Sequence, residues 1–340
     1  MKKRFLSSIL ALSLLGLTAC GQSQTSSDVK EQPTGSAEKV INLKSADTVA
    51  ATSPYTVGMN EFSELLAKET NGKIQLKHFP AGQLGNDIEV AEGVKMGSID
   101  LAMIGNVQTK ATDAFYLPFL FEDSEHWHAV LDGEIGEKIK QKIEEQSGLK
   151  LIGYVYFAPR IMTTKGKEIK TPEDLKGLKI RVPEIPLMVD TWKALGATPT
   201  PIVFGELFSA LQTGIVDAQE NPYEIAVNNS FFEVQDTIIE TNHSIPVRFL
   251  VMNKKKYESL TPEEQGILQK NWDATALKIE SLYKENEAEY IQTLKDKGMK
   301  FVQPDVNAFR EATKDVWKKY APEAWGEGVY EEIEALRKNK

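Results

Sequence analysis

The stretch that decides the fold is Gly177–Tyr223, GLKIRVPEIPLMVDTWKALGATPTPIVFGELFSALQTGIVDAQENPY. Its short apolar runs alternate with segments of helical spacing. Strands are expected at Lys179–Val182, Pro199–Pro201 and Ile215–Ala218, and helices at Ile185–Leu195 and Phe204–Thr213. Each helix is followed by a glycine, a residue suited to the helix C-terminus. Strands that alternate with helices predict a largely parallel sheet.

Two polar residues of this stretch lie close to predicted strand ends. Arg181 lies within the first strand, and Asn221 belongs to Gln219–Pro222, which we expect to leave the last strand as a turn. In sheets of this kind, ligands bind beyond the carboxyl ends of the strands. The pattern therefore predicts a binding site near Arg181 and Asn221.

The segment before this stretch predicts a second unit of the same kind. Val40–Ile104 shows the order β-α-β-α-β, and the strongly apolar run Ala114–Phe121 is expected to pack in a core or between lobes. That run is too short to span a membrane. The fold class expected from the pattern is α/β, with two lobes that are each a mainly parallel sheet flanked by helices.

A long helix is expected after the second lobe. Thr261-Pro262-Glu263-Glu264 has the form of a capping box, and helical periodicity continues without proline to Lys297. Such a helix spans about 50 Å and would brace both lobes. The alternative is two helices joined near Lys278. Terminal helices are expected at Asp305–Tyr320 and Pro322–Arg337.

The N-terminus has the form of a bacterial lipoprotein leader. Residues 1–20 contain a basic start, an apolar stretch and small residues before Cys20, the only cysteine. The alternative is an ordinary secretory leader. An acylated Cys20 would anchor the chain to membrane lipid outside the cytoplasm, at the cell surface or in the periplasm. The polar segment 21–38 is expected to be a flexible tether.

Charge and motifs narrow the function classes. The net charge is −9, and removal of the three basic residues of the leader makes it −12, which argues against nucleic acid as a partner. No HExxH, P-loop, GxGxxG or GxSxG motif occurs. His126 and His128 would point to different faces of a helix, so we expect no metal site. Because the enzyme motifs are missing, we also expect no cofactor and no catalytic residues.

Four motifs in one order carry a resemblance to a known family. They are K-I-R-V-P, A-L-G-A-T-P, F-G-E-L-F-S-A-L-Q-T-G and V-D-A-Q-E-N-P. This order resembles the solute-binding subunits of TRAP (tripartite ATP-independent periplasmic) transporters, and the likeness extends from about Val40 to about Gln303. It implies a periplasmic-binding-protein-like fold. Residues 39–157 would form most of lobe 1, 158–253 most of lobe 2, and 254–340 the bracing and terminal helices.

Arginine chemistry and the resemblance point to the same site. A guanidinium offers paired N–H donors that fit a carboxylate, so Arg160 and Arg181 could bind an acidic solute. The alternative is that each arginine forms an exposed salt bridge, which would contribute little to stability. The resemblance implies that Arg181 is the main carboxylate-binding residue and that Arg160 is the second arginine. It also implies that Asn221 faces the carboxylate and that Phe204 lies against the solute.

Three further residues complete the expected site. Glu220 is expected to orient an arginine rather than to touch the solute. Asn106 and Tyr55 are expected at the edge of the cleft. Sialic-acid-binding relatives have a glutamate near the position of Asn106, and its absence here argues against sialic acid as the solute.

The combined interpretation is an extracytoplasmic receptor that closes around a small organic acid. It would deliver a hexuronate-type sugar acid or a C4-dicarboxylate to a TRAP permease in the membrane. Two other functions stay open, namely a lipid-anchored sensory co-receptor and an enzyme acting on organic acids. The sequence does not decide between one and two carboxylates on the solute.

Overall fold

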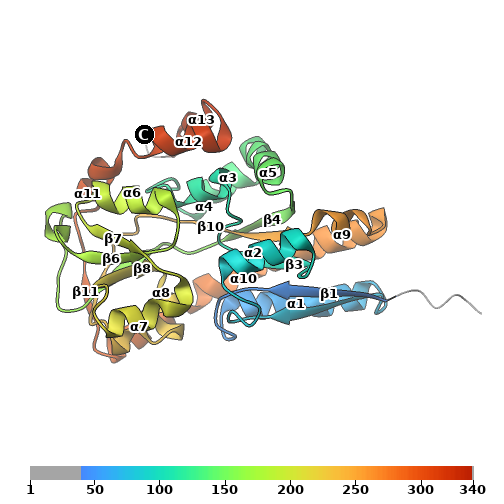
Figure 1. The fold of residues 1–340 in the computed structure, drawn as a ribbon, viewed down its shortest axis with the longest axis horizontal. Coiled ribbons are helices and arrows are strands. Elements are labelled where there is room, and N and C mark those ends of the chain that lie inside the picture. The colour runs from blue at the N-terminus through green and yellow to red at the C-terminus, as the bar shows by residue number, and fades with distance from the viewer. Residues whose placement is uncertain (1–39, 339–340) are drawn as a thin grey trace, which may run out of the picture. The chain divides into compact units, whose positions relative to one another are not determined.

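The computed structural model describes residues 40–338, so the expected leader, tether and lipidated Cys20 lie outside the described residues. The described chain contains two β-sheets, with strand orders β2-β1-β3-β10-β4 and β11-β9-β5-β8-β6-β7 (Figure 1). The strands of the first sheet are β1 (Ile41–Ala46), β2 (Ile74–Phe79), β3 (Leu101–Ile104), β4 (Lys150–Tyr156) and β10 (Val247–Met252). Those of the second are β5 (Ile161–Thr164), β6 (Lys179–Val182), β7 (Thr198–Pro201), β8 (Ala218–Asn221), β9 (Thr237–Ile239) and β11 (Lys300–Val302).

Helices accompany both sheets. They are α1 (Pro54–Glu69), α2 (Asp87–Met96), α3 (Lys110–Asp113), α4 (Ser124–Leu131), α5 (Glu134–Ser147), α6 (Pro186–Ala194), α7 (Leu207–Gln212), α8 (Tyr223–Asn228), α9 (Lys254–Glu258), α10 (Pro262–Asp296), α11 (Val306–Thr313), α12 (Trp317–Trp325) and α13 (Val329–Ala335). We call the first sheet with α1–α5 lobe 1, and the second sheet with α6–α8 lobe 2.

Both sheets are mainly parallel, as the sequence predicts. In lobe 1 only β10 opposes its neighbours, pairing antiparallel with β3 and β4. In lobe 2 only β5 does so, against β8 and β9. The α/β fold class with two lobes is therefore confirmed. Strand β10 follows β5–β9 of lobe 2 in sequence and yet lies in the lobe 1 sheet, and β11 then returns to lobe 2, so the chain crosses between the lobes more than once.

The end of the central stretch differs from the prediction. The last strand is β8, Ala218–Asn221, so the expected strand at Ile215–Ala218 and the expected turn at Gln219–Pro222 are wrong. Polar residues occupy β8 because it pairs with β5 inside the sheet, with Glu220 opposite Met162. Burial of these polar side chains is possible because Arg160 hydrogen-bonds Glu220. Hydrophobic patterning cannot find such a strand.

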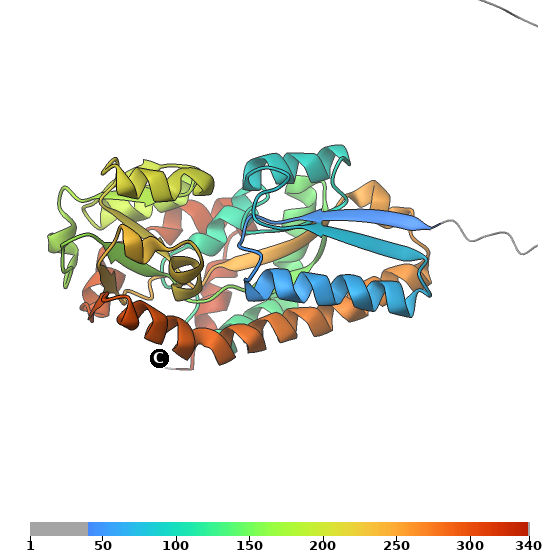
Figure 2. The ribbon, with the colours of Figure 1, turned by 90° about the horizontal axis from the view of Figure 1, so that it is seen from below.

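The long helix is continuous, as predicted. Thr261 and Glu264 form the capping box, Pro262 occupies the first turn, and the helix has 35 residues. It contacts α1 and β4 of lobe 1 and α8 of lobe 2, and Figure 2 shows it running beneath both lobes. Trp272 is buried and packs edge-on against Phe62 with ring centroids 5.6 Å apart. The helix therefore connects the two lobes.

The C-terminal helices differ from the prediction. Instead of two helices, the chain forms α11, α12 and α13, and Pro322 lies inside α12. The chain breaks between α11 and α12 at residues 314–316, and between α12 and α13 at Gly326 and Gly328, which have φ angles of 103° and 85°. Pro322 has no backbone N–H, so α12 lacks the helical hydrogen bond from residue 322 to the carbonyl of Lys318.

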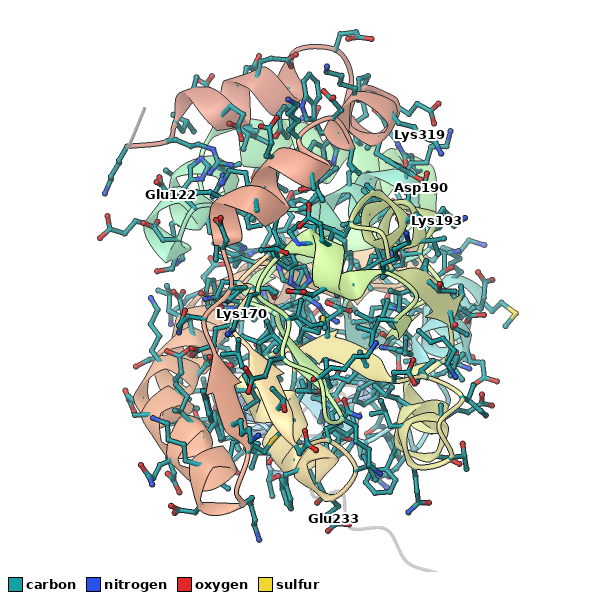
Figure 3. The ribbon with its side chains drawn as sticks, turned by 90° about the vertical axis from the view of Figure 1, so that its left-hand side faces the viewer. Glu122, Lys170, Asp190, Lys193, Glu233 and Lys319 are labelled. Atoms are coloured by element: carbon teal, nitrogen blue, oxygen red, sulfur yellow. The ribbon has the colours of Figure 1, made fainter. Side chains whose placement is uncertain are left out.

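Helix α12 links the terminal region to lobe 2. It also contacts α3 and α5 of lobe 1, and α13 contacts α5. Asp190 of α6 accepts hydrogen bonds of 2.6 Å from the Lys319 ammonium and the Tyr320 hydroxyl (Figure 3). The apolar run Ala114–Phe121 packs in the core as expected, with Phe115 against Tyr154 and Trp325. Within residues 40–338, no helix combines the length and apolar character needed to cross a bilayer.

Candidate functional site

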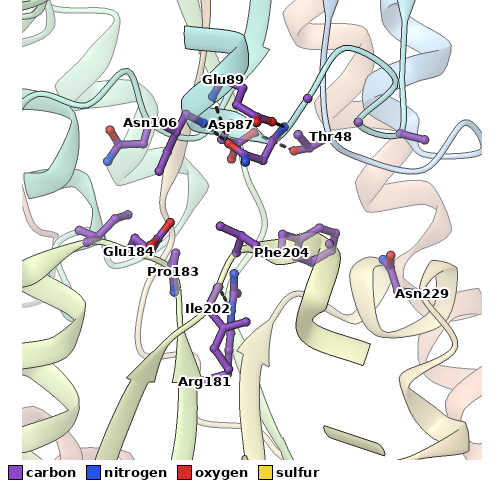
Figure 4. Close-up of a pocket in the computed structure, with 18 of the residues that line it drawn as sticks. Thr48, Asp87, Glu89, Asn106, Arg181, Pro183, Glu184, Ile202, Phe204 and Asn229 are labelled. Atoms are coloured by element: carbon purple, nitrogen blue, oxygen red, sulfur yellow. Dashed lines mark hydrogen bonds between the residues drawn. The ribbon is translucent and has the colours of Figure 1, made fainter. Parts of the chain in front are cut away.

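A cavity of about 590 Å³ lies between loops of the two lobes (Figure 4). Its polar lining from lobe 1 comprises Thr48, Asn86, Asp87, Glu89, Asn106 and Gln108. Lobe 2 contributes Arg181, Glu184, Ile202, Phe204, Phe208 and Asn229, among others. Half of these residues belong to loops that follow β1, β2, β3, β6 and β7. The carboxyl ends of the parallel strands in both lobes therefore build the cavity, as expected for this class of sheet.

Arg181 is the cation of the cavity. It lies in β6 with 3% of its surface exposed, and its Nε donates a 2.8 Å hydrogen bond to the carbonyl of Ile202. Its guanidinium carbon lies 5.9 Å from the ring centre of Phe204. Within residues 40–338, its two terminal nitrogens have no hydrogen-bond partner. Their free N–H donors form a fork that fits a carboxylate.

Burial lowers the pKa of Arg181, but the side chain keeps its charge at neutral pH. Desolvation is the main cause that lowers its pKa, and Arg160 lowers it further, whereas Glu220 opposes both. The resulting pKa is about 10. The guanidinium is therefore charged at neutral pH and is poorly solvated, so an anion in the cavity would stabilise it.

A buried ion pair lies behind Arg181. Nη2 of Arg160 donates 2.7 Å hydrogen bonds to Oε1 and to the carbonyl oxygen of Glu220, and Nε of Arg160 bonds Oε2. The ring of His243 lies 3.2 Å from the same Oε2. Burial would raise the pKa of Glu220, but Arg160 and His243 lower it to about 2. Neither Arg160 nor Glu220 lines the cavity.

The seven predicted site residues fall into two groups. Arg181, Phe204 and Asn106 line the cavity. The other four do not line it, and they are Arg160, Glu220, Asn221 and Tyr55. A contact between these four and a solute remains a prediction.

Local hydrogen bonds hold two members of the second group. The Asn221 amide donates a 2.7 Å bond to the side chain of Gln219, and only 4% of Asn221 is exposed. Tyr55 is fully buried, and its hydroxyl donates a 3.2 Å bond to the carbonyl of Tyr156. Tyr55 thus lies inside lobe 1 rather than at the edge of the cavity.

Sequence reasoning missed the acidic wall of the cavity. Asp87 and Glu89 carry the typical signal of a helix start, and Glu89 does accept a 2.9 Å hydrogen bond from the backbone N–H of Asn86 in a capping box. The same two carboxylates line the cavity, and Thr48 donates a 2.8 Å hydrogen bond to Asp87. A helix start directly after a strand-end loop is the signal that could have found them.

A hydrogen-bonded Ser45–His78–Asp47 chain resembles a catalytic triad in composition only. The hydroxyl of Ser45 lies 2.8 Å from one ring nitrogen of His78, and the other nitrogen lies 3.0 Å from Asp47. Both Ser45 and Asp47 are fully buried, and none of the three lines the cavity. The described residues also contain no group of three or more side chains placed to hold a metal ion.

Known proteins match this chain over most of its length. Residues 45–323 match the family described as "Bacterial extracellular solute-binding protein, family 7". A solute-binding protein of Roseobacter denitrificans is 38% identical over 259 residues, covering 75% of this chain and 79% of the relative. The 2,3-diketo-L-gulonate-binding periplasmic protein of Escherichia coli is 32% identical over 291 residues, covering 83% of this chain and 88% of the relative.

Solved structures agree with these matches. The Roseobacter denitrificans protein, a TRAP periplasmic solute-binding protein with bound L-galactonate, superposes with a TM-score of 0.82 at 31% identity, covering 88% and 99% of the two chains. The TRAP solute-binding protein of Xanthobacter autotrophicus with bound β-D-galacturonate superposes with a TM-score of 0.83 at 31% identity. The match covers 87% of this chain and 100% of that protein. The chain therefore belongs to the family 7 bacterial extracellular solute-binding proteins, the TRAP receptors that its four sequence motifs indicate.

Proposed function

We propose that this receptor binds the carboxylate of a small organic acid at Arg181 and delivers the solute to a TRAP permease. The observation that supports it is the buried guanidinium whose terminal N–H groups are free within the described residues and line the cavity. A buried cation without an anion is costly, and a carboxylate would supply two charge-assisted hydrogen bonds. No bond in the solute is made or broken.

The proposed solutes are sugar acids such as the galactonate, galacturonate and diketogulonate named for the relatives. A volume of about 590 Å³ lies within the usual range of small-molecule sites. Polar groups of lobe 1 can bond the hydroxyls of such a solute. The rings of Phe204 and Phe208 offer an apolar surface for its carbon skeleton.

Binding would be coupled to closure of the lobes. A solute held at Arg181 of lobe 2 would also contact Asp87 or Asn106 of lobe 1. Contacts to both lobes favour the closed state because only that state makes all of them. The closed, loaded form is the one that the permease would recognise.

The receptor would remain attached to membrane lipid through Cys20. Support comes from the apolar leader that ends at this single cysteine and from the polar tether that follows. Cys20→Ala should release the protein from the membrane fraction of the producing bacterium. Retention of the variant in that fraction would contradict lipidation at Cys20.

A thermal-shift screen tests the proposed function. Purified protein is heated with galactonate, galacturonate, glucuronate, malate, succinate or a neutral sugar such as galactose. A tight ligand raises the apparent Tm by mass action, so at least one acid should raise it while galactose does not. A screen in which no organic acid raises the Tm, or in which galactose raises it as much, would contradict carboxylate binding.

A further inference from the structure

The charges around the cavity are unequal. Among the described residues that line it, Arg181 is the one cation, whereas Asp87, Glu89 and Glu184 are acidic. Figure 4 shows Asp87 and Glu89 on the lobe 1 wall, across the cavity from Arg181 and Glu184 of lobe 2. A solute therefore meets one positive group and several negative ones.

The acidic groups keep oxygen atoms free for a solute. One oxygen of Asp87 accepts the hydrogen bond from Thr48, and one oxygen of Glu89 accepts the bond from Asn86. The second oxygen of each carboxylate has no protein partner within residues 40–338. Glu184 lies two residues after β6, on the Arg181 side of the cavity, and its side chain is exposed. These oxygens can accept hydrogen bonds but cannot donate them when ionised.

The chemical consequence differs for the two ends of a solute. The end held by Arg181 must be anionic, because the free guanidinium N–H groups need acceptors. The end that reaches the acidic wall must carry donors such as hydroxyl groups. A second carboxylate there would face like charges in a partly desolvated site, which is unfavourable.

We propose that the receptor selects polyhydroxy acids with a single carboxylate and rejects dicarboxylates, with Asp87 and Glu89 of the acidic wall as specificity-determining residues. This inference rests on the proposed binding of a carboxylate at Arg181. It separates two solute classes that the sequence leaves open. The acidic wall acts by hydrogen bonding to solute hydroxyls and by repelling a second negative charge.

Two matched pairs of acids test the inference by isothermal titration calorimetry. Galactonate and galactarate share one carbon skeleton and differ by a carboxylate at carbon 6, as do glucuronate and glucarate at carbon 1. Malate and succinate are the short dicarboxylates. A monocarboxylate should bind at least about tenfold more tightly than its dicarboxylate partner, since a like charge is brought near the wall.

Neutral substitutions in the wall should reduce this selectivity. The double variant Asp87→Asn, Glu89→Gln should narrow the ratio of the two Kd values at least about threefold, because the repulsion is reduced. Glu92→Gln is the matched control, since Glu92 lies on the same helix, pairs with Lys95 and does not line the cavity. The control should leave the ratio unchanged.

Two results would overturn the inference while leaving the proposed function standing. One is a wild-type receptor that binds galactarate, glucarate or malate as tightly as the best monocarboxylate. The other is a double variant, folded by circular dichroism, that keeps the wild-type ratio. Failure of all the acids to bind the wild-type receptor would instead contradict the proposed function itself.

Discussion

Replacement of Glu224 by glutamine should stabilise the protein at alkaline pH. Glu224 lies on α8 of lobe 2 and is fully buried. The Asn228 amide donates a 2.5 Å hydrogen bond to its Oε1, whereas Oε2 has no hydrogen-bond partner. Ser53, the N-cap of α1 in lobe 1, also hydrogen-bonds the carboxylate and lowers its pKa. The side chain therefore lies where the two lobes meet.

The size of the effect follows from the pKa. Desolvation is the main cause that raises the pKa of Glu224 to about 7 from its usual 4.5, although Ser53, Asn228 and Arg248 lower it in part. The Glu224 carboxylate therefore binds a proton more tightly in the folded protein than in the unfolded chain. The contribution of Glu224 to stability is therefore highest below pH 4.5 and is lost as the pH rises through 7, by about 3 kcal/mol in total.

Urea unfolding followed by tryptophan fluorescence at pH 5 and pH 8 measures this effect. Glutamine cannot ionise, so the Glu224→Gln variant should gain at least about 2 kcal/mol relative to wild type between the two pH values. Glu61→Gln, at an exposed position of α1, is the control and should show no such gain. An equal stability difference between variant and wild type at both pH values would refute the reasoning.

Three further substitutions test the packing, and urea unfolding measures each. Gly153→Ala should cost about 1–3 kcal/mol, because its Cβ would lie 2.5 Å from Nε1 of buried Trp272; no loss would show that α10 can move away from β4. Thr261→Ala removes the cap of α10 and should cost about 1 kcal/mol, and an unchanged midpoint would contradict that role. Arg160→Ala should cost about 3–5 kcal/mol by leaving Glu220 buried without its partner. A loss below 1 kcal/mol would mean that the pair contributes little.

Local sequence patterns predicted the elements with strong apolar periodicity. The strand Lys179–Val182, the helix that follows it and the continuous helix from Pro262 all form as expected. Their signals are local, since they consist of apolar spacing, proline at a helix start and a capping box. Strand β8 was missed because its side chains are polar and are compensated by distant residues such as Arg160.

The candidate site was predictable only in part. Arg181 and Phe204 were found because the motifs around them resemble a known family, and both line the cavity. The role of the acidic wall was not found, because the helix-start signal of Asp87 and Glu89 does not show that α2 of lobe 1 faces Arg181 of lobe 2 across the cavity. No local pattern contains that juxtaposition. The return of β10 to the lobe 1 sheet is likewise a long-range pairing.

The central claim is that the guanidinium of Arg181 binds the carboxylate of the solute. The most direct test is isothermal titration calorimetry of the wild type and Arg181→Lys with the best acid from the thermal-shift screen. Lysine keeps the charge but lacks the planar fork and the Nε donor that bonds Ile202. Affinity should fall at least about 100-fold, about 2.7 kcal/mol. An unchanged Kd in a folded Arg181→Lys variant would contradict the account.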